Sequence, residues 1–196
     1  MKDYIFIVFR KNFVLGKVKT RIAKDSSDEI ALEIYKSLCN ISEELYESEN
    51  YNTQIYFSDF IPNQASHFLS VIQQGNDLGI RMANAFQKNV KQGSKVILIG
   101  TDCPYIKRSD IDSAFCQLDN SDLIIGPCKD GGYYLIGLKS FYPELFSGIQ
   151  WSTSEVFQKT IEIAKSLNLN VSLLPEYEDI DSYQNWLDFL KSKSYG

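Results

Sequence analysis

Hydrophobic and polar positions follow two patterns along this chain. Short apolar or alternating runs predict β-strands, and apolar residues spaced three and four apart predict amphipathic helices between them. The strands are expected at 4–9, 53–58, 96–100, 122–126, 133–138 and 171–174. The helices are expected at 27–48, from Asp77 onwards, at 109–118, from Trp151-Ser152-Thr153 to about 166, and at 182–192. Ser26 or Ser27, and Ser152 or Thr153, are the expected N-terminal caps of two of these helices.

Alternation of strands with helices is typical of proteins built from β-α-β units. Such units give a mostly parallel sheet with helices on both faces, so we expect a three-layer α/β/α fold with a mixed, mostly parallel sheet. The chain has 196 residues, enough for one full hydrophobic core, and it shows no internal repeat, low-complexity segment or linker. Residues 1–196 are therefore predicted to form a single domain.

The most informative segment is the apolar run 96–99, which ends in Gly100-Thr101-Asp102. In open α/β sheets, ligands bind beyond the carboxyl ends of the strands, so Asp102 is expected at the mouth of a cleft. An exposed carboxylate at that place suits Mg²⁺, which usually takes one or two protein carboxylates together with substrate phosphates. The alternative is that Asp102 caps the helix that begins near Ser109 or closes an Asx turn.

Positive charge is concentrated near the N-terminus. Residues 1–24 contain seven lysines and arginines and one acidic residue, whereas the whole chain carries −5, so residues 25–196 carry −11. A nucleic-acid-binding protein would need a broad basic surface, so we expect no nucleic acid partner. One basic loop indicates either a localised anionic ligand such as a phosphate chain, or a solvated lysine-rich loop. The strand before the loop directs Lys17, Lys19 and Arg21 to the same sheet edge as Asp102.

The composition excludes several other classes of protein. Hydrophobic residues make up 44% of the chain and charged residues 23%, as in ordinary globular proteins. No apolar run approaches the roughly 20 residues of a membrane span, and segment 4–9 is too short for a signal peptide. We therefore expect a cytoplasmic, enzyme-sized domain without a membrane partner. The four cysteines lack C-x-x-C spacing, which argues against zinc, and Cys103 has no recognisable link to His67, the only histidine.

Three further segments carry residues suited to a ligand site. Asp130-Gly131-Gly132 follows the strand at 122–126, where glycines allow a ligand to approach the backbone and Asp130 is either a base or part of a hairpin turn. Asp181 lies between the last strand and the last helix, as a second metal ligand or a helix cap. Arg81 lies near the start of a helix, where it would contact a nucleotide or pair with a neighbouring acid. No one of these segments decides the function.

Taken together, the segments resemble a known family. The stretches 8–21, 75–82, 100–104, 126–138, 150–153 and 179–182 are similar, in this order, to a bacterial family related to GT-A-type nucleotide-diphospho-sugar transferases. That family is often called radical-SAM/selenodomain-associated transferase or arsenosugar-biosynthesis glycosyltransferase. The resemblance covers nearly the whole chain, and its most specific parts are the loop 16–21 and the segment 130–138.

The resemblance implies a GT-A fold and a divalent-metal-dependent transferase that uses Mg²⁺ or Mn²⁺ and an activated nucleotide. Asp102 and Asp181 match the positions that bind the metal. Catalytic roles are implied for Asp130, Lys19 and Arg21, with Asp130 placed where an acceptor or sugar would lie. The nucleotide and its phosphates would be bound by Gly16, Lys17, Lys19, Thr20, Arg21, Arg81 and Thr101. The acceptor or sugar would be bound by Asp130, Gly131, Gly132, Trp151, Ser152 and Thr153.

Two departures from related families leave the reaction open. The strict Asp-x-Asp of many glycosyltransferases is replaced by Gly100-Thr101-Asp102, and the G-x-G-x-R loop of sugar nucleotidyltransferases is replaced by Gly16–Arg21. The family assignment favours transfer of a sugar from a nucleotide sugar to a small acceptor. Nucleotidyl transfer, which couples a nucleoside triphosphate to a phosphorylated small molecule and releases pyrophosphate, also suits the basic loop and the paired carboxylates. A non-catalytic nucleotide-binding scaffold is the third alternative.

Overall fold

A seven-stranded sheet forms the centre of the molecule. The computed structural model describes residues 4–63 and 67–194. The strand order is β3-β2-β1-β4-β6-β5-β7, and β6 is the antiparallel member, pairing with β4 and β5, while the other neighbours pair in parallel. The strands are β1 (Tyr4–Arg10), β2 (Asn52–Phe57), β3 (Leu69–Ile72), β4 (Lys95–Ile99), β5 (Leu123–Pro127), β6 (Tyr133–Leu138) and β7 (Val171–Leu173). The mixed, mostly parallel sheet predicted from the sequence is therefore confirmed.

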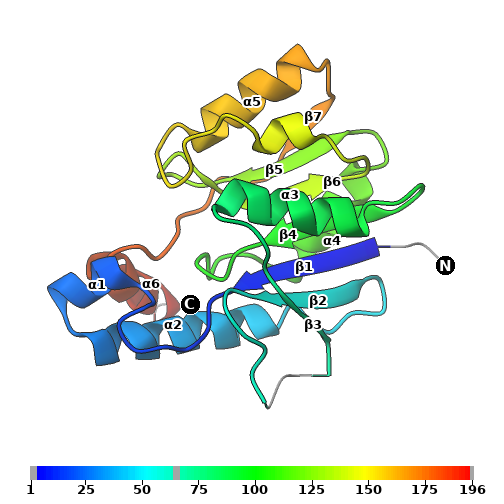
Figure 1. The fold of residues 1–196 in the computed structure, drawn as a ribbon. Coiled ribbons are helices and arrows are strands. Elements are labelled where there is room, and N and C mark those ends of the chain that lie inside the picture. The colour runs from blue at the N-terminus through cyan, green and yellow to red at the C-terminus, as the bar shows by residue number, and fades with distance from the viewer. Residues whose placement is uncertain (1–3, 64–66, 195–196) are drawn as a thin grey trace.

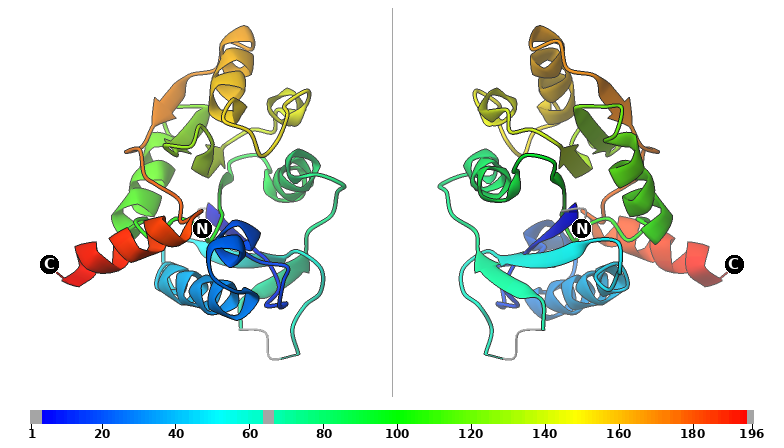
Figure 2. Two further views of the ribbon diagram at one scale, coloured as in Figure 1. Left: turned by 90° about the vertical axis from the view of Figure 1, so that its left-hand side faces the viewer. Right: turned by 90° about the vertical axis from the view of Figure 1, so that its right-hand side faces the viewer.

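Helices cover both faces of the sheet, which gives three layers (Figures 1 and 2). The helices are α1 (Thr20–Asp25), α2 (Asp28–Glu43), α3 (Leu78–Asn89), α4 (Arg108–Gln117), a 3₁₀ helix η1 (Pro143–Phe146), α5 (Val156–Ser166) and α6 (Tyr183–Ser194). Alternate residues of β1 face opposite sides, as the pleat of a strand requires. Ile7 packs in the same core as Met82 of α3 and Ala164 of α5, whereas Phe6 packs in the same core as Phe115 of α4.

The sequence pattern located most elements to within a few residues. The strands predicted at 96–100 and 133–138 are β4 and β6, and the helix predicted at 27–48 is α2, which Ser27 caps by accepting a hydrogen bond from the Ile30 amide. The predicted cap of α5 is wrong: its N-cap is Glu155, without a side-chain hydrogen bond, because Ser152 and Thr153 belong to the preceding turn. The elements α1, β3 and η1 were not predicted.

A third group of elements lies beyond the carboxyl ends of β1 and β4. Here α1, α2 and α6 pack together around Ile22, Ile34, Ile180 and Phe189, all of them buried. Figure 1 shows α1 and α6 side by side beyond the arrowhead of β1, although more than 150 residues separate them in the chain. This group brings the segment before α6 to the same sheet edge as the segment after β4. None of the helices in the described part of the chain is long and apolar enough to cross a membrane.

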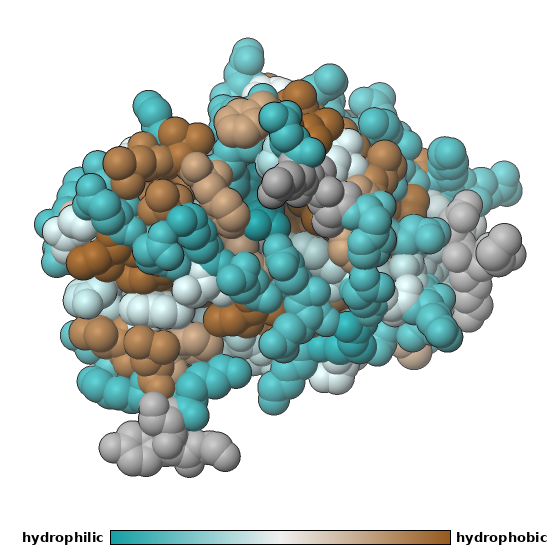
Figure 3. Space-filling view, turned by 90° about the horizontal axis from the view of Figure 1, so that it is seen from below, coloured by the Kyte–Doolittle hydropathy of each residue, from teal (hydrophilic) through white to brown (hydrophobic). Residues whose placement is uncertain are grey.

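The loops that follow β1 and β2 hold each other at this edge. Buried Asn12 donates from Nδ2 to the Phe60 carbonyl over 2.7 Å, and its Oδ1 accepts from the Asp59 amide over 2.9 Å. Large apolar side chains beside these contacts are exposed, namely Phe13, Val14, Leu15, Phe60 and Ile61. On the face seen in Figure 3, hydrophobic side chains form separate patches among hydrophilic ones. The contacts of Asn12 therefore fix the start of the basic loop next to the sheet edge.

Candidate active site

Two cavities open side by side at the carboxyl ends of the parallel strands. One has a volume of about 520 Å³ and is bordered by β1, β4 and the start of α3; the other has about 560 Å³ and is bordered by α1 and the segment before α5. The residues that line both are Lys11, Lys19, Leu78, Asp102, Tyr133, Ser152 and Asp179. The two cavities are thus halves of one cleft, and charged side chains gather where they meet. The sheet edge predicted from the sequence is the edge at which the cleft lies.

Asp102 lies at the junction of the two halves, as the sequence predicts. Its strand, β4, is buried throughout, and the chain leaves the sheet through Gly100 and buried Thr101. The Asp102 side chain is 42% exposed, and its backbone carbonyl accepts a hydrogen bond of 2.9 Å from the amide of Ile180. The carboxylate is therefore held at the cleft by a rigid strand behind it and by the segment before α6 beside it.

Asp179 is a functional candidate that the sequence analysis missed. Ile180 is fully buried, and its contact with Asp102 brings Asp179 into both halves of the cleft. Burial and the negative charge of Asp102 raise the pKa of Asp179 to about 7, and Cys128 donates to its Oδ1 over 3.3 Å. Two carboxylates close enough to repel each other are a natural place for a cation. The sequence showed only a short run of acids here and gave no sign of which one turns inwards.

Lys19 neutralises part of this negative charge. Its side chain is only 6% exposed, and Nζ lies 2.7 Å from Asp102 Oδ1 and 3.9 Å from Asp181 Oδ1. Nζ also donates to the carbonyl of Ile180 over 2.7 Å. Arg21, on the exposed side, pairs with Asp181 over 2.9 Å. The structure therefore brings together four residues that the sequence singled out, the two predicted metal ligands and the two predicted phosphate-binding cations, as an ion-pair network.

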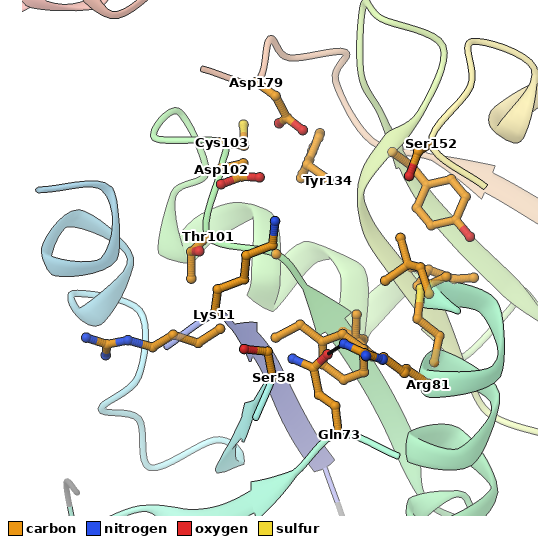
Figure 4. Close-up of a pocket in the computed structure, with 18 of the residues that line it drawn as sticks. Lys11, Ser58, Gln73, Arg81, Thr101, Asp102, Cys103, Tyr134, Ser152 and Asp179 are labelled. Carbon is orange, nitrogen blue, oxygen red and sulfur yellow. Dashed lines mark hydrogen bonds between the residues drawn. The ribbon is translucent and has the colours of Figure 1, made fainter. Parts of the chain in front are cut away.

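Lys11 is a second residue that the sequence analysis did not place in the site. It follows the last residue of β1 and lines both halves of the cleft. Figure 4 shows its side chain extending from the end of the strand into the cavity. Its backbone is fixed by buried Tyr35, whose hydroxyl accepts from the Lys11 amide over 2.7 Å and also from Thr101 Oγ1 over 3.2 Å. Tyr35 therefore ties the end of β1 to the end of β4.

The 520 Å³ half of the cleft is lined by polar side chains from neighbouring strand ends. Arg81 of α3 donates from Nε to the carbonyl of Gly75 over 3.0 Å and lies 3.5 Å from Gln73 Oε1. Thr101 lines the same half, and Ser58 lies across from it at the end of β2 (Figure 4). Arg81 thus contacts a backbone carbonyl and an amide, not the neighbouring acid considered as an alternative. Its guanidinium remains part of the cavity wall.

The 560 Å³ half contains all but Gly131 of the residues predicted to bind an acceptor or sugar, namely Asp130, Gly132, Trp151, Ser152 and Thr153. Thr20, predicted at the phosphates, lines it as well. Asp130 Oδ1 accepts from the amide of Gly132 over 2.9 Å, so its carboxylate shapes the turn between β5 and β6 while facing the cavity. Gly131 has a φ of +87°, and a Cβ there would overlap the backbone of Ser154, so this turn requires glycine. Gly16 and Lys17 belong to the basic loop but line neither half.

The cysteines do not supply a nucleophile to the cleft. Cys103 is buried, and burial raises the pKa of its thiol well above the usual range. Burial also raises the pKa of the Cys128 thiol, which donates its hydrogen to Asp179. Because the thiolate and not the thiol is the nucleophile, these two residues are packing and hydrogen-bonding groups.

Comparison with known proteins agrees with this architecture. No curated protein matches the chain. A crystal structure of a protein from Desulfovibrio desulfuricans G20, provisionally named a nucleotide-diphospho-sugar transferase, is 31% identical, with a TM-score of 0.86 over 93% of this chain and 84% of that one. The 2-C-methyl-D-erythritol 4-phosphate cytidylyltransferase of Thermus thermophilus is 12% identical, with a TM-score of 0.55 over 100% of both chains. CMP:2-keto-3-deoxy-manno-octonic acid synthetase, solved with CTP, is 8% identical, with a TM-score of 0.54 over 98% of both chains.

The last two similarities show the fold alone, and together with the Desulfovibrio structure they confirm the predicted GT-A-like architecture. At the level of sequence, residues 41–153, more than half of the chain, match one family profile. The chain therefore belongs to the DUF2064 family, whose description reads "Uncharacterized protein conserved in bacteria".

Proposed function

We propose that this protein is a divalent-metal-dependent transferase that moves a sugar from a nucleotide-diphospho-sugar to a small acceptor. The observation that carries the proposal is the pair of cavities, about 520 and 560 Å³, that meet at Asp102 and Asp179. A nucleotide sugar also has two halves, a nucleoside and a sugar, joined by a diphosphate. The 31% identity to the Desulfovibrio protein supports the same reaction class. The proposal includes membership of the narrower group that the sequence resembles, the radical-SAM/selenodomain-associated transferases.

The donor set at the junction fits Mg²⁺ or Mn²⁺. Asp102 and Asp179 offer hard carboxylate oxygens, and their mutual repulsion raises the pKa of Asp179 beyond what burial does alone. Asp181 is the less suitable second ligand, because Arg21 already pairs with it. Among the described residues, no group of three or more ligating side chains is close enough to form a complete metal cage. Two carboxylates with the remaining positions left to substrate phosphates and water are the arrangement that Mg²⁺ commonly takes.

In this mechanism the metal would supply positive charge for the diphosphate leaving group. The chain itself provides the acceptor site. Asp130, on the glycine turn, accepts the proton of the acceptor hydroxyl. The oxygen of that hydroxyl then bonds to the anomeric carbon of the sugar, and the bond between that carbon and the diphosphate breaks. Trp151 offers an aromatic surface in the same half of the cleft. Lys19 pairs with Asp102 and so holds that carboxylate in place beside the group that departs.

Nucleotidyl transfer is the second candidate. The observation in its favour is that the two cytidylyl-transferring neighbours match this chain over 98% or more of both lengths, so the chain is of their size as well as their fold. In that reaction the α-phosphate is attacked by a phosphate oxygen of the acceptor and pyrophosphate leaves. Pyrophosphate carries more negative charge than the nucleoside diphosphate that leaves in sugar transfer, so nucleotidyl transfer would depend more on Lys19 and Arg21.

A thermal-shift panel of nucleoside triphosphates, nucleoside diphosphates and nucleotide sugars, with and without Mg²⁺, tests the proposal. A ligand that binds only the folded protein raises its melting temperature by mass action. We expect metal-dependent stabilisation by one nucleotide sugar and its diphosphate, and loss of the metal-dependent part in Asp102→Asn. Asp188→Asn should behave as wild type, because Asp188 is an exposed carboxylate of α6 that lines neither half of the cleft.

Other results would redirect the assignment. Stabilisation mainly by a triphosphate, with pyrophosphate released on addition of sugar phosphates, would establish nucleotidyl transfer. Nucleotide binding that survives Asp102→Asn, without turnover of any donor, would indicate a scaffold. No shift with any ligand of the panel would refute the proposed function.

A further inference from the structure

The charged residues at the junction of the two cavities are not equivalent. Two lysines and two aspartates line both halves of the cleft, namely Lys11, Lys19, Asp102 and Asp179. If the halves hold a nucleoside and a sugar, as the proposed function on which this step rests requires, the diphosphate between them must lie at this junction. A diphosphate needs donors that are not already occupied by protein oxygens.

Lys19 is largely occupied. Its ammonium has three hydrogens, and it already lies near three protein oxygens, on Asp102, Ile180 and Asp181. Its side chain is also almost completely buried, so that a ligand would have to displace one of these contacts. Arg21 is likewise engaged with Asp181. Lys19 and Arg21, which the sequence pattern favoured as phosphate ligands, therefore already form ion pairs with carboxylates of the protein.

Lys11 differs in each respect. It is exposed, its side chain reaches into the cavity in Figure 4, and it forms no ion pair within 4.0 Å with any carboxylate of residues 4–63 and 67–194. Its position does not depend on such a pair, because Tyr35 holds its backbone amide and ties it to Thr101, next to Asp102. A cation anchored through the main chain keeps its ammonium available for a ligand.

We infer that Lys11 forms the anion subsite of the cleft and binds the diphosphate of the nucleotide substrate, while Lys19 organises the carboxylates. The subsite takes a diphosphate because it lies where both cavities meet, within reach of the metal-binding carboxylates and of a free ammonium. One lysine is a point charge, so it favours total negative charge over a particular geometry and binds pyrophosphate itself as well as a nucleoside diphosphate.

The test compares Lys11→Met with Lys24→Met. Lys24 is an exposed lysine of α1, in the same basic region, and lines neither half of the cleft. Calorimetric titrations with ADP, CDP, GDP, UDP, their nucleosides and inorganic pyrophosphate, all with Mg²⁺, give the dissociation constants. We expect Lys11→Met to weaken diphosphate and pyrophosphate binding by about tenfold or more, since a charge-assisted hydrogen bond is lost. Binding of the nucleoside and the unfolding temperature stay unchanged, and Lys24→Met behaves as wild type.

The outcomes separate this inference from the proposed function. If a nucleoside diphosphate binds wild type and Lys11→Met equally well, the subsite is refuted and the proposed function stands. If no nucleotide binds but pyrophosphate does so through Lys11, the subsite stands and the proposed function fails. If neither nucleotides nor pyrophosphate bind the wild-type protein, both are wrong. Equal losses in Lys11→Met and Lys24→Met would mean general electrostatic attraction, which also overturns the subsite.

Discussion

Replacing Asp179 by asparagine should make the protein more stable and less active. Asparagine keeps the size of the side chain and still accepts the hydrogen bond from Cys128, but it removes a charge that is buried next to Asp102. A shift of one pKa unit corresponds to about 1.4 kcal/mol in the free-energy difference between the charged and the neutral form. The rise of the Asp179 pKa from 3.8 to about 7 therefore sets an upper limit of roughly 4 kcal/mol for the gain. Allowing for local relaxation, we expect roughly 2–4 kcal/mol, or about 5–10 °C in melting temperature.

The gain must depend on pH with a definite sign. Below about pH 4 the carboxyl is protonated in both the folded and the unfolded protein, so wild type and Asp179→Asn differ little. Between about pH 4 and 7 the unfolded chain releases the proton and the folded protein keeps it, so wild-type stability falls as pH rises. Above pH 7 the difference is constant and largest. Urea unfolding at about pH 4 and pH 8 measures both ends of this curve.

Asp181→Asn is the matched control, because Asp181 lies two residues away, is 37% exposed and pairs with Arg21. It should lose up to about 1 kcal/mol, since exposed ion pairs contribute little. Adding Mg²⁺ should stabilise the wild-type protein and the Asp181 variant but not Asp179→Asn. If Asp179→Asn is no more stable than wild type at pH 8, the two carboxylates do not repel each other and the basis for a metal at this junction is lost.

Three further changes test the parts of the site. Tyr35→Phe removes the acceptor of the Lys11 amide, so it should cost about 1–3 kcal/mol in urea unfolding and weaken nucleoside diphosphate binding. Gly79→Ala would place a methyl group where the indole of Trp151 lies, so Trp151 must move. Turnover should fall while diphosphate binding persists, and an unchanged rate would show that Trp151 is not needed. Lys19→Met removes the positive charge that pairs with Asp102, so the free energy of unfolding should fall by about 1–3 kcal/mol and recover in part with Mg²⁺. Full stability without metal would contradict the structural role of Lys19.

The position of Asp102 could be predicted from sequence because it depends on local features. An apolar strand that ends abruptly in small and polar residues is informative in itself, and the rule that ligands bind at the carboxyl edge of a parallel sheet supplies the rest. The same holds for the glycine turn at Gly131, whose φ of +87° reflects a local backbone requirement. These parts of the site are encoded in short, local stretches of chain.

Asp179 and Lys11 could not be selected in this way, because their roles depend on distant segments. Asp179 enters the cleft because the amide of Ile180 bonds to the carbonyl of Asp102, far earlier in the chain, and because Ile180 is buried among α1, α2 and α6. Lys11 differs from Lys17 and Lys24 of the same basic region because it lines both halves of the cleft, and from Lys19 and Arg21 because no ion pair with a described carboxylate occupies it. The elements that escaped prediction have similar causes. Helix α1 is six residues long without a capping side chain, and β3 is a four-residue edge strand with exposed Leu69.

Backbone strain independently marks the same place in the molecule. In the described part of the chain, three residues other than glycine have positive φ: Lys19 at 46°, Ser152 at 64° and Asn168 at 55°. Asparagine tolerates this conformation, but lysine and serine adopt it at a cost of roughly 1 kcal/mol each. The two costly residues both line both halves of the cleft, on opposite segments. At Lys19 the left-handed turn precedes α1 and accompanies the turn of its side chain into the carboxylates. Backbone strain is often found at functional sites, so its position on both sides of this junction supports the proposal that the substrate is held there.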